Sequence, residues 1–396
     1  MAFLTAAFCI KLALAWYTKG STDVYIWTQF VRDVAADGVG VYRRPYEVTF
    51  FNHPPFMIHI CLLWNWLQQT TGIPIHFWIR FFPAVADIGS FLVLYHLILR
   101  RQFSAAWMKP MMWWVCAPVG LIISGFHGNT DPVMIFFFLL CISLIENEYS
   151  ILWAGLALGL SMCLKVVPLL FIPVLFFNLG WRRFIQLWAV AAAVFVIAGL
   201  PYIAQDTLFL LHRIFGYSGA YGWWGISRIL TMWAPPSLFW LDTFFHSYGQ
   251  KILFGLVVVA AWWMNRLPRR PSLYEQSAMT LLIFFAITPG FATQYLAWLL
   301  PFVLVLSWRS QIAFHVTTAF YLCFAYSVWF VFGPTANAAL LLGTPWGNSI
   351  RAAELLCWFT IVILAFQYGA YLRREEKDGT ALSPDSPLAN PECEPS

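Results

Sequence analysis

The sequence predicts an all-α, polytopic membrane protein with about 12 transmembrane helices. Hydrophobic residues fill 61% of the 396 positions and charged residues only 10%, whereas soluble domains carry about 25% charged residues. Mean hydropathy is +0.70. The apolar residues also form continuous runs rather than the alternation of a barrel strand. A chain of this composition cannot cover a surface that faces water, so lipid must surround it.

The predicted spanning helices are the continuous apolar runs of the chain. These runs are 1–18, 78–99, 110–125, 132–146, 151–178, 184–202, 250–264, 275–290, 294–308, 311–333 and 352–371. Run 54–71 is different, because it is short and carries polar side chains such as His59 and Gln68. A run of that kind is typical of a helix at the membrane interface. Segment 226–247 is compatible with a loop or with a further hairpin.

Basic residues in short loops predict which ends face the cytoplasm. The clusters are Arg100, Arg101 and Lys109; Arg182 and Arg183; Arg266, Arg269 and Arg270; Arg309; and Arg373, Arg374 and Lys377. Placing all of them inside puts both termini in the cytoplasm and makes 19–77 one long extracytoplasmic loop. Run 151–178 must then be two short helices that meet near Lys165 on the outer side. As a single span it would place Arg182 outside.

The chain is expected to form one transmembrane domain over 1–372, followed by a cytoplasmic tail over 373–396. The tail is polar and rich in Pro and Glu, a composition typical of disorder. The net charge of +5 is spread over short loops, so it indicates orientation and predicts no nucleic-acid partner. No small-residue cleavage site precedes Asp23, and run 1–18 is therefore interpreted as a retained helix.

This topology gathers unusual polar residues on the extracytoplasmic side. They lie in "KGSTDVYIW", "FNHPPF", "GFHGNTDP", "SMCLKVVP", "GWWGISRIL" and "TPGFATQY". An ionisable residue at membrane depth is a functional-site hypothesis by default, because burying it is costly. The candidate site residues are Asp23, His53, His127, Asn129, Asp131, Lys165, Arg228, Gln294 and Tyr295.

Structural roles compete with the functional ones at several of these positions. Asp23 could cap a helix over 24–36, and Asp131 before Pro132 has the form of an N-cap. His53 could simply help to start the helix after it. Lys165 could be a lysine that extends toward the membrane surface, and Arg228 an anchor at the interface. Asp87, within run 78–99, is expected to bond a neighbouring helix.

Taken together, the polar set suits sugar transfer from a lipid-phosphate donor. A carboxylate outside the membrane can act as a general base on a hydroxyl. A cation can stabilise a phosphate leaving group, aromatic side chains can bind a sugar, and a groove within the bundle can hold a polyprenyl chain. A lipid-linked sugar flippase or another transporter is the alternative, although the sequence contains no convincing internal repeat.

The order of motifs resembles that of the GT-C glycosyltransferases. Within them the chain is most similar to the family 87 mannosyltransferases that use polyprenyl-phosphate sugars, and to the ER glucosyltransferases that use dolichyl-phosphate glucose. The matching segments are Thr22–Tyr25, Asn52–Pro55, "IRFFPAVADIGSFLVLYHLILRR", "PVGLIISGFHGNTDPVMIFFF" and "AGLALGLSMCLKVVPLLFIPVLFF". The resemblance covers roughly residues 15–180 and is weaker at "TPGFATQYLAWLLPF".

The resemblance implies a GT-C-type bundle with interfacial helices in its first outer loop, and an inverting hexosyltransferase. Asp23 matches the position of the catalytic acidic residue, which would act as the general base that deprotonates the acceptor hydroxyl. His127, Asn129 and Asp131 match a second outer loop that holds substrate or, in some relatives, a metal. Lys165 matches a basic position near the lipid phosphate. "NHPP" stands where the family has a "DYPP"-like motif, so an acidic residue of that motif is absent here.

The expected partners are a polyprenyl-phosphate sugar donor, a lipid-linked glycan or glycolipid acceptor, and membrane lipid. Mannose or glucose is the expected sugar. No DxD pair is present, so no metal site and no required cofactor are predicted, with a divalent metal left as an option. The expected location is the bacterial plasma membrane, or the ER membrane in a eukaryote.

Overall fold

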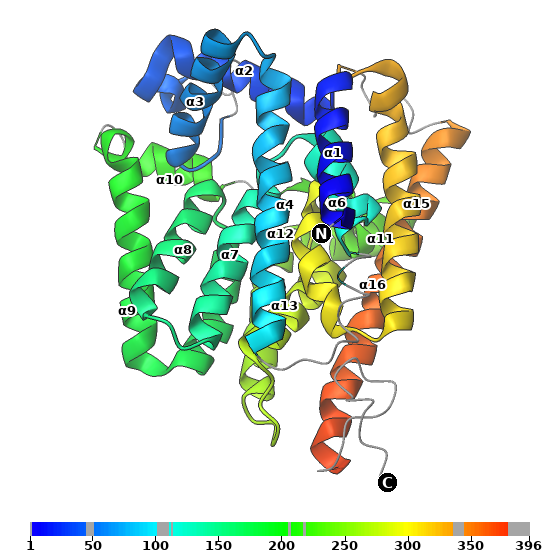
Figure 1. The fold of residues 1–396 in the computed structure, drawn as a ribbon. Helices are drawn as coiled ribbons and strands as arrows, with labels where there is room; N and C mark the ends of the chain where they lie inside the picture. Colours follow the sequence, from blue (N-terminus) through cyan, green and yellow to red (C-terminus); the bar gives the residue numbers. More distant parts are fainter. Residues whose placement is uncertain are drawn as a thin grey trace.

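Long helices run along one axis of the bundle in the computed structural model, which describes residues 2–44, 51–100, 111, 114–204, 207–216, 219–335 and 344–378 (Figure 1). The long helices are α4 (Ile75–Arg100), α9 (Ile172–Ile203), α12 (Phe239–Met264), α15 (Trp308–Phe332) and α16 (Pro345–Asp378). Within the described residues these five are long and apolar enough to cross a membrane. The predicted class, an all-α polytopic membrane protein, is confirmed.

Shorter apolar segments complete the bundle. They are α6 (Pro118–Ile122) with the π-helix η3 (Ile123–His127), α8 (Ile151–Leu164), α13 (Leu273–Ile287), and η6 (Thr293–Tyr295) with α14 (Leu296–Leu299) and η7 (Leu300–Val305). α1 (Ala2–Tyr17) and α2 (Thr22–Asp37) would add a sixth span only as one broken unit, and they are bent by 66°. The count of about 12 spans therefore stays a prediction.

The remaining elements are short. They are η1 (Gly38–Arg43), α3 (Phe56–Thr71), α7 (Asp131–Glu146), η4 (Val167–Phe171), α10 (Thr207–Phe215), α11 (Gly225–Trp233), η5 (Pro236–Leu238), β1 (Ala220–Tyr221) and β2 (Gly290–Phe291). The two strands pair antiparallel, with Ala220 opposite Phe291. α2 and α3 lie over one end of the bundle (Figure 1). α3 is not among the candidate spans of the described chain, which agrees with an interfacial role for run 54–71.

The predicted break near Lys165 is present. α8 ends at Leu164, and Lys165 is extended, with φ −152° and ψ 146°. α9 is interrupted at Gly180, whose φ of 70° and ψ of 165° are not helical. Gly155 packs against Val190, and Gly159 against Val194, so α8 and the second part of α9 run in the same direction. The chain must therefore cross back between Lys165 and Gly180, as the charge pattern predicted.

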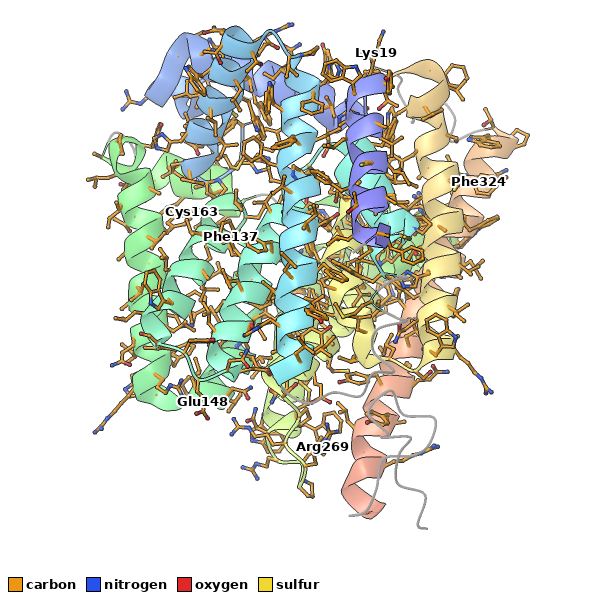
Figure 2. The ribbon with its side chains drawn as sticks, in the orientation of Figure 1. Lys19, Phe137, Glu148, Cys163, Arg269 and Phe324 are labelled. Atoms are coloured by element: carbon orange, nitrogen blue, oxygen red, sulfur yellow. The ribbon has the colours of Figure 1, made fainter. Side chains whose placement is uncertain are left out.

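The bundle has a basic end that lies away from α2 and α3. Lys19 lies at one end of the molecule, and Glu148 and Arg269 lie at the other (Figure 2). The Arg270 guanidinium donates to the backbone carbonyl of Phe177, which brings the loop after α12 close to the loop at Gly180. Two of the basic clusters used for orientation therefore meet at one end.

Three sequence boundaries need correction. α12 begins at Phe239, so segment 226–247 consists of α11, η5 and the first turns of α12 rather than a separate hairpin. Run 250–264 is the second half of one helix. α16 continues to Asp378, into the tail that we expected to be disordered from residue 373. Arg, Glu and Lys favour helix once a preceding helix has nucleated. Residues 379–396 lie outside the described part.

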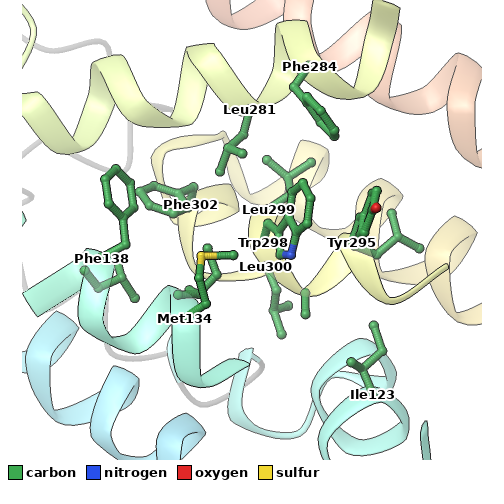
Figure 3. Packing of buried hydrophobic residues seen from close by; sticks show 14 of the residues in the cluster. Ile123, Met134, Phe138, Leu281, Phe284, Tyr295, Trp298, Leu299, Leu300 and Phe302 are labelled. Atoms are coloured by element: carbon green, nitrogen blue, oxygen red, sulfur yellow. The ribbon is translucent and has the colours of Figure 1, made fainter. Parts of the chain in front are cut away.

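Aromatic and aliphatic side chains from α7, α13 and the 293–305 segment fill the centre of the bundle (Figure 3). Phe138 packs between Phe171 and Phe302, with ring centroids 4.1 and 6.4 Å away. Trp298 stacks on Tyr295 at 4.0 Å. This packing holds the 293–305 segment against α7, which matters because both elements carry candidate site residues.

Candidate active site

The turn between α1 and α2 presents Asp23. Ser21 is the N-cap of α2, and its hydroxyl accepts a hydrogen bond from the backbone N–H of Asp23 at 3.1 Å. Ser and Asp are both strong N-cap residues, so the sequence supported either choice. The capping interpretation of Asp23 is wrong, because Ser21 takes that role and leaves the Asp23 carboxylate free to make other contacts.

One oxygen of the Asp23 carboxylate receives three side-chain donors. Oδ2 lies 3.0 Å from Nε2 of His127, and it accepts from Nδ2 of Asn129 at 2.6 Å and from Nε2 of Gln294 at 3.3 Å. Within the described chain, Oδ1 has no hydrogen-bond partner. The side chain is 26% exposed. Asp23 is thus held firmly through Oδ2, while Oδ1 remains available to a ligand.

His127 stands at the end of the π-helix η3, a type of element that is frequent at functional sites. The hydroxyl of Ser21 donates to the His127 carbonyl at 2.8 Å and lies 2.9 Å from Nδ1. A carboxylate oxygen can only accept, so Nε2 must carry the proton that it shares with Asp23. The Asp23 turn and the His127 turn are therefore joined by both side chains and backbone.

The charge of Asp23 is stabilised despite its surroundings. Burial by itself would raise the pKa of this carboxyl, but the nearby His127, the hydrogen bonds from His127 and Asn129 and the charge of Lys165 outweigh it and lower the pKa below the usual value. Asp23 is thus an anion at neutral pH. An anionic carboxylate with one free oxygen can accept a proton from a hydroxyl group.

In a second carboxylate, that of Asp131, both oxygens accept hydrogen bonds from other side chains of the protein. Its two oxygens accept from Nζ of Lys165 at 2.9 and 2.7 Å, and the indole N–H of Trp298 also donates to it. Its side chain is 0% exposed. The N-cap residue of α7 is Thr130, so the capping interpretation of Asp131 is wrong. Lys165 is paired with a buried anion, so it is not a lysine extended to the membrane surface.

Tyr295 and His53 border the same region. Nζ of Lys165 lies 5.5 Å from the centre of the Tyr295 ring. The His53 ring lies 4.5 Å from that of Trp27. Burial, followed by the charge of Lys165, lowers the pKa of His53 to about 3, so this imidazole is neutral at physiological pH. The N-cap residue of α3 is Pro55, so His53 does not cap that helix.

Arg228 belongs to a separate cluster. Its Nε donates to Glu354 of α16 at 2.7 Å, and its guanidinium lies 5.1 Å from the ring of Trp223. Only 6% of the residue is exposed, so it is not a surface anchor. Its two terminal nitrogens have no hydrogen-bond partner within the described chain. The structure does not join Arg228 to the hydrogen-bond network of Asp23.

The sequence analysis missed several polar residues of this region. Arg80 is fully buried beside the Asp23 turn, and Lys11 pairs with Asp87 within the bundle. Each is a cation inside an apolar run, a signal that could have identified both. Asp87 also accepts from Ser124 at 2.5 Å, which confirms that it bonds neighbouring segments. The hydroxyl of Tyr326 is buried and has no hydrogen-bond partner in the part of the chain that the structure describes, and its ring lies 5.3 Å from that of His127.

The residues around Asp23 do not form a recognisable metal cage. Among the described residues, no group of three or more His, Cys, Asp and Glu side chains is placed to hold an ion. Asp23 and His127 are bonded to each other, and Asp131 is bonded to Lys165.

The fold and the site define a class of protein. It is a multi-pass membrane protein in which a partly exposed carboxylate, held by a histidine and two amides, lies beside aromatic rings and a lysine that is paired with a buried aspartate. Comparison with known sequences identifies the family. The model of glycosyltransferase family 87 matches residues 50–289, more than half of the chain, and the protein belongs to that family. It is therefore a membrane glycosyltransferase.

The matched range includes most of the candidate residues but begins after Asp23 and ends before Gln294. The evidence for Asp23 is thus its geometry rather than the family match. No curated protein sequence matches the chain significantly. Membership of a glycosyltransferase family does not favour the flippase alternative.

Proposed function

We propose that the protein transfers a hexose from a polyprenyl-phosphate donor to a hydroxyl of a lipid-linked glycan or glycolipid, with inversion at the anomeric carbon. Asp23 is the general base. The observation that carries this proposal is that the two oxygens of the Asp23 carboxylate have different contacts. Oδ2 is held by three donors, while Oδ1 has no partner among the described residues and the side chain is 26% exposed.

The proposed step is a single displacement. Oδ1 of Asp23 takes the proton of the acceptor hydroxyl as the acceptor oxygen forms a bond to the anomeric carbon. The bond between that carbon and the phosphate oxygen breaks on the opposite face, and polyprenyl phosphate leaves with the bonding electrons. One displacement gives inversion, and no covalent sugar–enzyme intermediate forms. Positioned proton transfer of this kind contributes typically 10²–10⁴-fold to a rate.

Two cations are available for the leaving phosphate. Lys165 uses two contacts on Asp131, and an ammonium group has three N–H donors, so one donor remains. Among the described residues, Arg228 bonds Glu354 through Nε alone, which leaves its two terminal nitrogens for a phosphate. We assign Lys165 to the donor phosphate when the sugar lies beside Asp23, and Arg228 to a site that the same phosphate contacts as the donor approaches. His53, which is partly exposed, supplies a ring surface for the sugar, and Tyr295, which is buried against Trp298, supports Lys165 from behind.

Replacing Asp23 tests the proposal directly. Asp23→Asn keeps the shape of the side chain and removes the base, so we expect turnover to fall at least 100-fold, with the protein still folded. The assay follows transfer from radiolabelled polyprenyl-phosphate mannose and glucose to a membrane lipid extract, with and without EDTA. Full turnover by a folded Asp23→Asn protein would rule out Asp23 as the base.

A matched control is available on the same helix. Asp33 lies in α2 and pairs with Arg44 at 2.8 Å, away from the Asp23 contacts. Asp33→Asn should leave turnover close to that of the wild type. If the wild type moved labelled lipid across proteoliposomes and formed no transfer product, the transferase proposal itself would be wrong.

A further inference from the structure

Arg80 of α4 lies behind the Asp23 turn, with 0% of the residue exposed. No carboxylate pairs with it within the described chain. A buried charge without a counter-ion is costly unless hydrogen bonds satisfy it. The environment of Arg80 therefore requires an explanation.

Every N–H of Arg80 has an oxygen to bond. Nε donates to the His76 carbonyl at 2.8 Å within α4. Nη1 donates to the hydroxyl of Thr18 at 2.7 Å and to the Leu14 carbonyl at 3.2 Å. Nη2 donates to the carbonyls of Ala15 and Thr18, both at 2.7 Å. Five donors in a fixed fork are a property of arginine alone, since lysine has only three.

Three of these acceptors lie where α1 ends: the carbonyls of Leu14 and Ala15 in its last turn, and that of Thr18 directly after it. The final carbonyls of a helix have no partner within the helix and carry its partial negative charge. Arg80 supplies both the hydrogen bonds and the opposite charge. It thereby fixes the position at which α1 ends, and Asp23 follows only five residues after Thr18.

Arg80 also contacts the turn that carries the partners of Asp23. Nη1 lies 3.5 Å from the carbonyl of Phe126. A Cβ atom placed on Gly128 would lie 3.2 Å from Cγ of Arg80 and 2.3 Å from Cγ2 of Val24. Gly128 has φ of +80°, which favours glycine. Arg80 and the first turn of α2 thus pack so closely against Gly128 that no side chain fits at that position.

We propose that Arg80 is the positioning residue of this site: it holds the end of α1 against the 126–129 turn, so that the Asp23 carboxylate meets the donors of His127 and Asn129. The role is distinct from catalysis, because Arg80 is buried behind the backbone and does not reach the reacting atoms. The proposal rests on the proposed function only for its kinetic readout.

The test compares Arg80→Lys and Arg80→Met with Lys11→Met. Lys11 is the matched control, since it is also a buried cation that joins α1 to α4, through Asp87, but within the described chain it donates neither to the carbonyls at the end of α1 nor to the 126–129 turn. For the Arg80 variants we expect kcat per folded protein to fall at least tenfold. KM for the donor should change less than threefold, and the acid limb of the pH–rate profile should move to higher pH. Lys11→Met should lower thermal stability alone.

A second readout does not require activity. Carbodiimides modify protonated carboxyl groups, so the pH dependence of labelling at Asp23, measured by mass spectrometry, follows its titration. In the Arg80 variants, labelling should persist to higher pH, because Asp23 has lost its donors. If the wild type transfers no hexose, the proposed function fails, whereas this labelling shift still decides the role of Arg80.

A purely structural role would give a different result. A folded Arg80→Met protein with wild-type kcat and wild-type labelling of Asp23 would overturn the proposal. If Arg80→Met does not fold, Thr18→Val replaces it, since that change removes one acceptor of Arg80 and leaves the arginine in place. Thr18→Val should shift kcat and labelling in the same direction by a smaller factor. No shift in either measurement would likewise contradict the proposal.

Discussion

Asp23 Oδ2 receives three donors from two distant segments, His127 and Asn129 in one turn and Gln294 in another. This arrangement has two consequences at the scale of the residue. The donors stabilise the charged form of the carboxylate and lower its pKa. They also leave Oδ1 without a partner in the described chain, so that stabilisation and reactivity are assigned to different oxygens of one group.

The pH dependence of the reaction follows from these contacts. Asp23 must be ionised to act as a base, and its pKa is lowered, so kcat/KM should fall only as the pH drops below the usual range for an aspartate. Asn129→Leu removes the 2.6 Å donor. We expect the pKa of Asp23 to rise, and the acid limb of kcat/KM to move up by about one pH unit.

The measurement is kcat/KM for the donor between pH 3 and 8, because this quantity reports the free enzyme. Asn147→Leu, at the opposite end of α7, is the control and should keep the wild-type profile. An unchanged acid limb in Asn129→Leu would mean that Asp23 is not the group that titrates.

At the scale of the element, the pair formed by Asp131 and Lys165 joins the start of α7 to the end of α8. Asp131 is the first residue of α7, and Lys165 is the residue after α8. Trp298 adds a third element through its indole N–H. The pair therefore fixes the position of the break between α8 and the segment after it, at the same end of the bundle as Asp23. The break depends on tertiary contacts as well as on local sequence.

Removing one member of this pair should be more damaging than removing both. Lys165→Met leaves the Asp131 carboxylate buried without its cation, which typically costs about 3–5 kcal/mol. The double variant Lys165→Met/Asp131→Leu should regain a large part of that loss. Unfolding in mixed detergent–SDS micelles measures the difference.

Glu148→Gln, in the exposed turn between α7 and α8, is the control and should show no measurable change in stability. If the double variant lost as much as the sum of the two single variants, the two side chains would act independently, and the pair could not be the link between the helices.

At the scale of the whole molecule, the polar site and the basic loops lie at different ends. Lys19, near Asp23, is far from Glu148 and Arg269 (Figure 2). The direction of α8 and of the second part of α9 agrees with this separation. If the basic end faces the cytoplasm, as short basic loops usually do, the site faces the opposite side, where we place the transfer reaction.

Cysteine accessibility tests this orientation. Lys19→Cys and Arg182→Cys lie in exposed positions, and a membrane-impermeant maleimide should label them from opposite sides of sealed vesicles. The background needs Cys9, Cys116 and Cys323 replaced, because these thiols are exposed. Labelling of both positions from one side would contradict the proposed topology.

The sequence predicted more of the topology than of the site. Continuous apolar runs and the positions of basic residues were enough to identify the membrane class and the break at Lys165. Boundaries were less certain, and α12 and α16 extend beyond the apolar runs that indicated them. A helix continues through polar residues when its backbone bonds are already formed, so hydropathy marks the part of a helix in lipid rather than its whole length.

Sequence alone determined the class of the protein, the segments that carry its polar residues, and the presence of a carboxylate at Asp23. Only the tertiary structure decided that Ser21 caps α2, that Asp131 pairs with Lys165, and that Arg80 donates hydrogen bonds to the carbonyls at the end of α1. Composition and periodicity indicate whether a segment is surrounded by lipid, by water or by other parts of the protein. Hydrogen bonds between residues 60 to 270 positions apart, such as those of Arg80 and Asp23, depend on how the helices pack against one another, which no local pattern encodes.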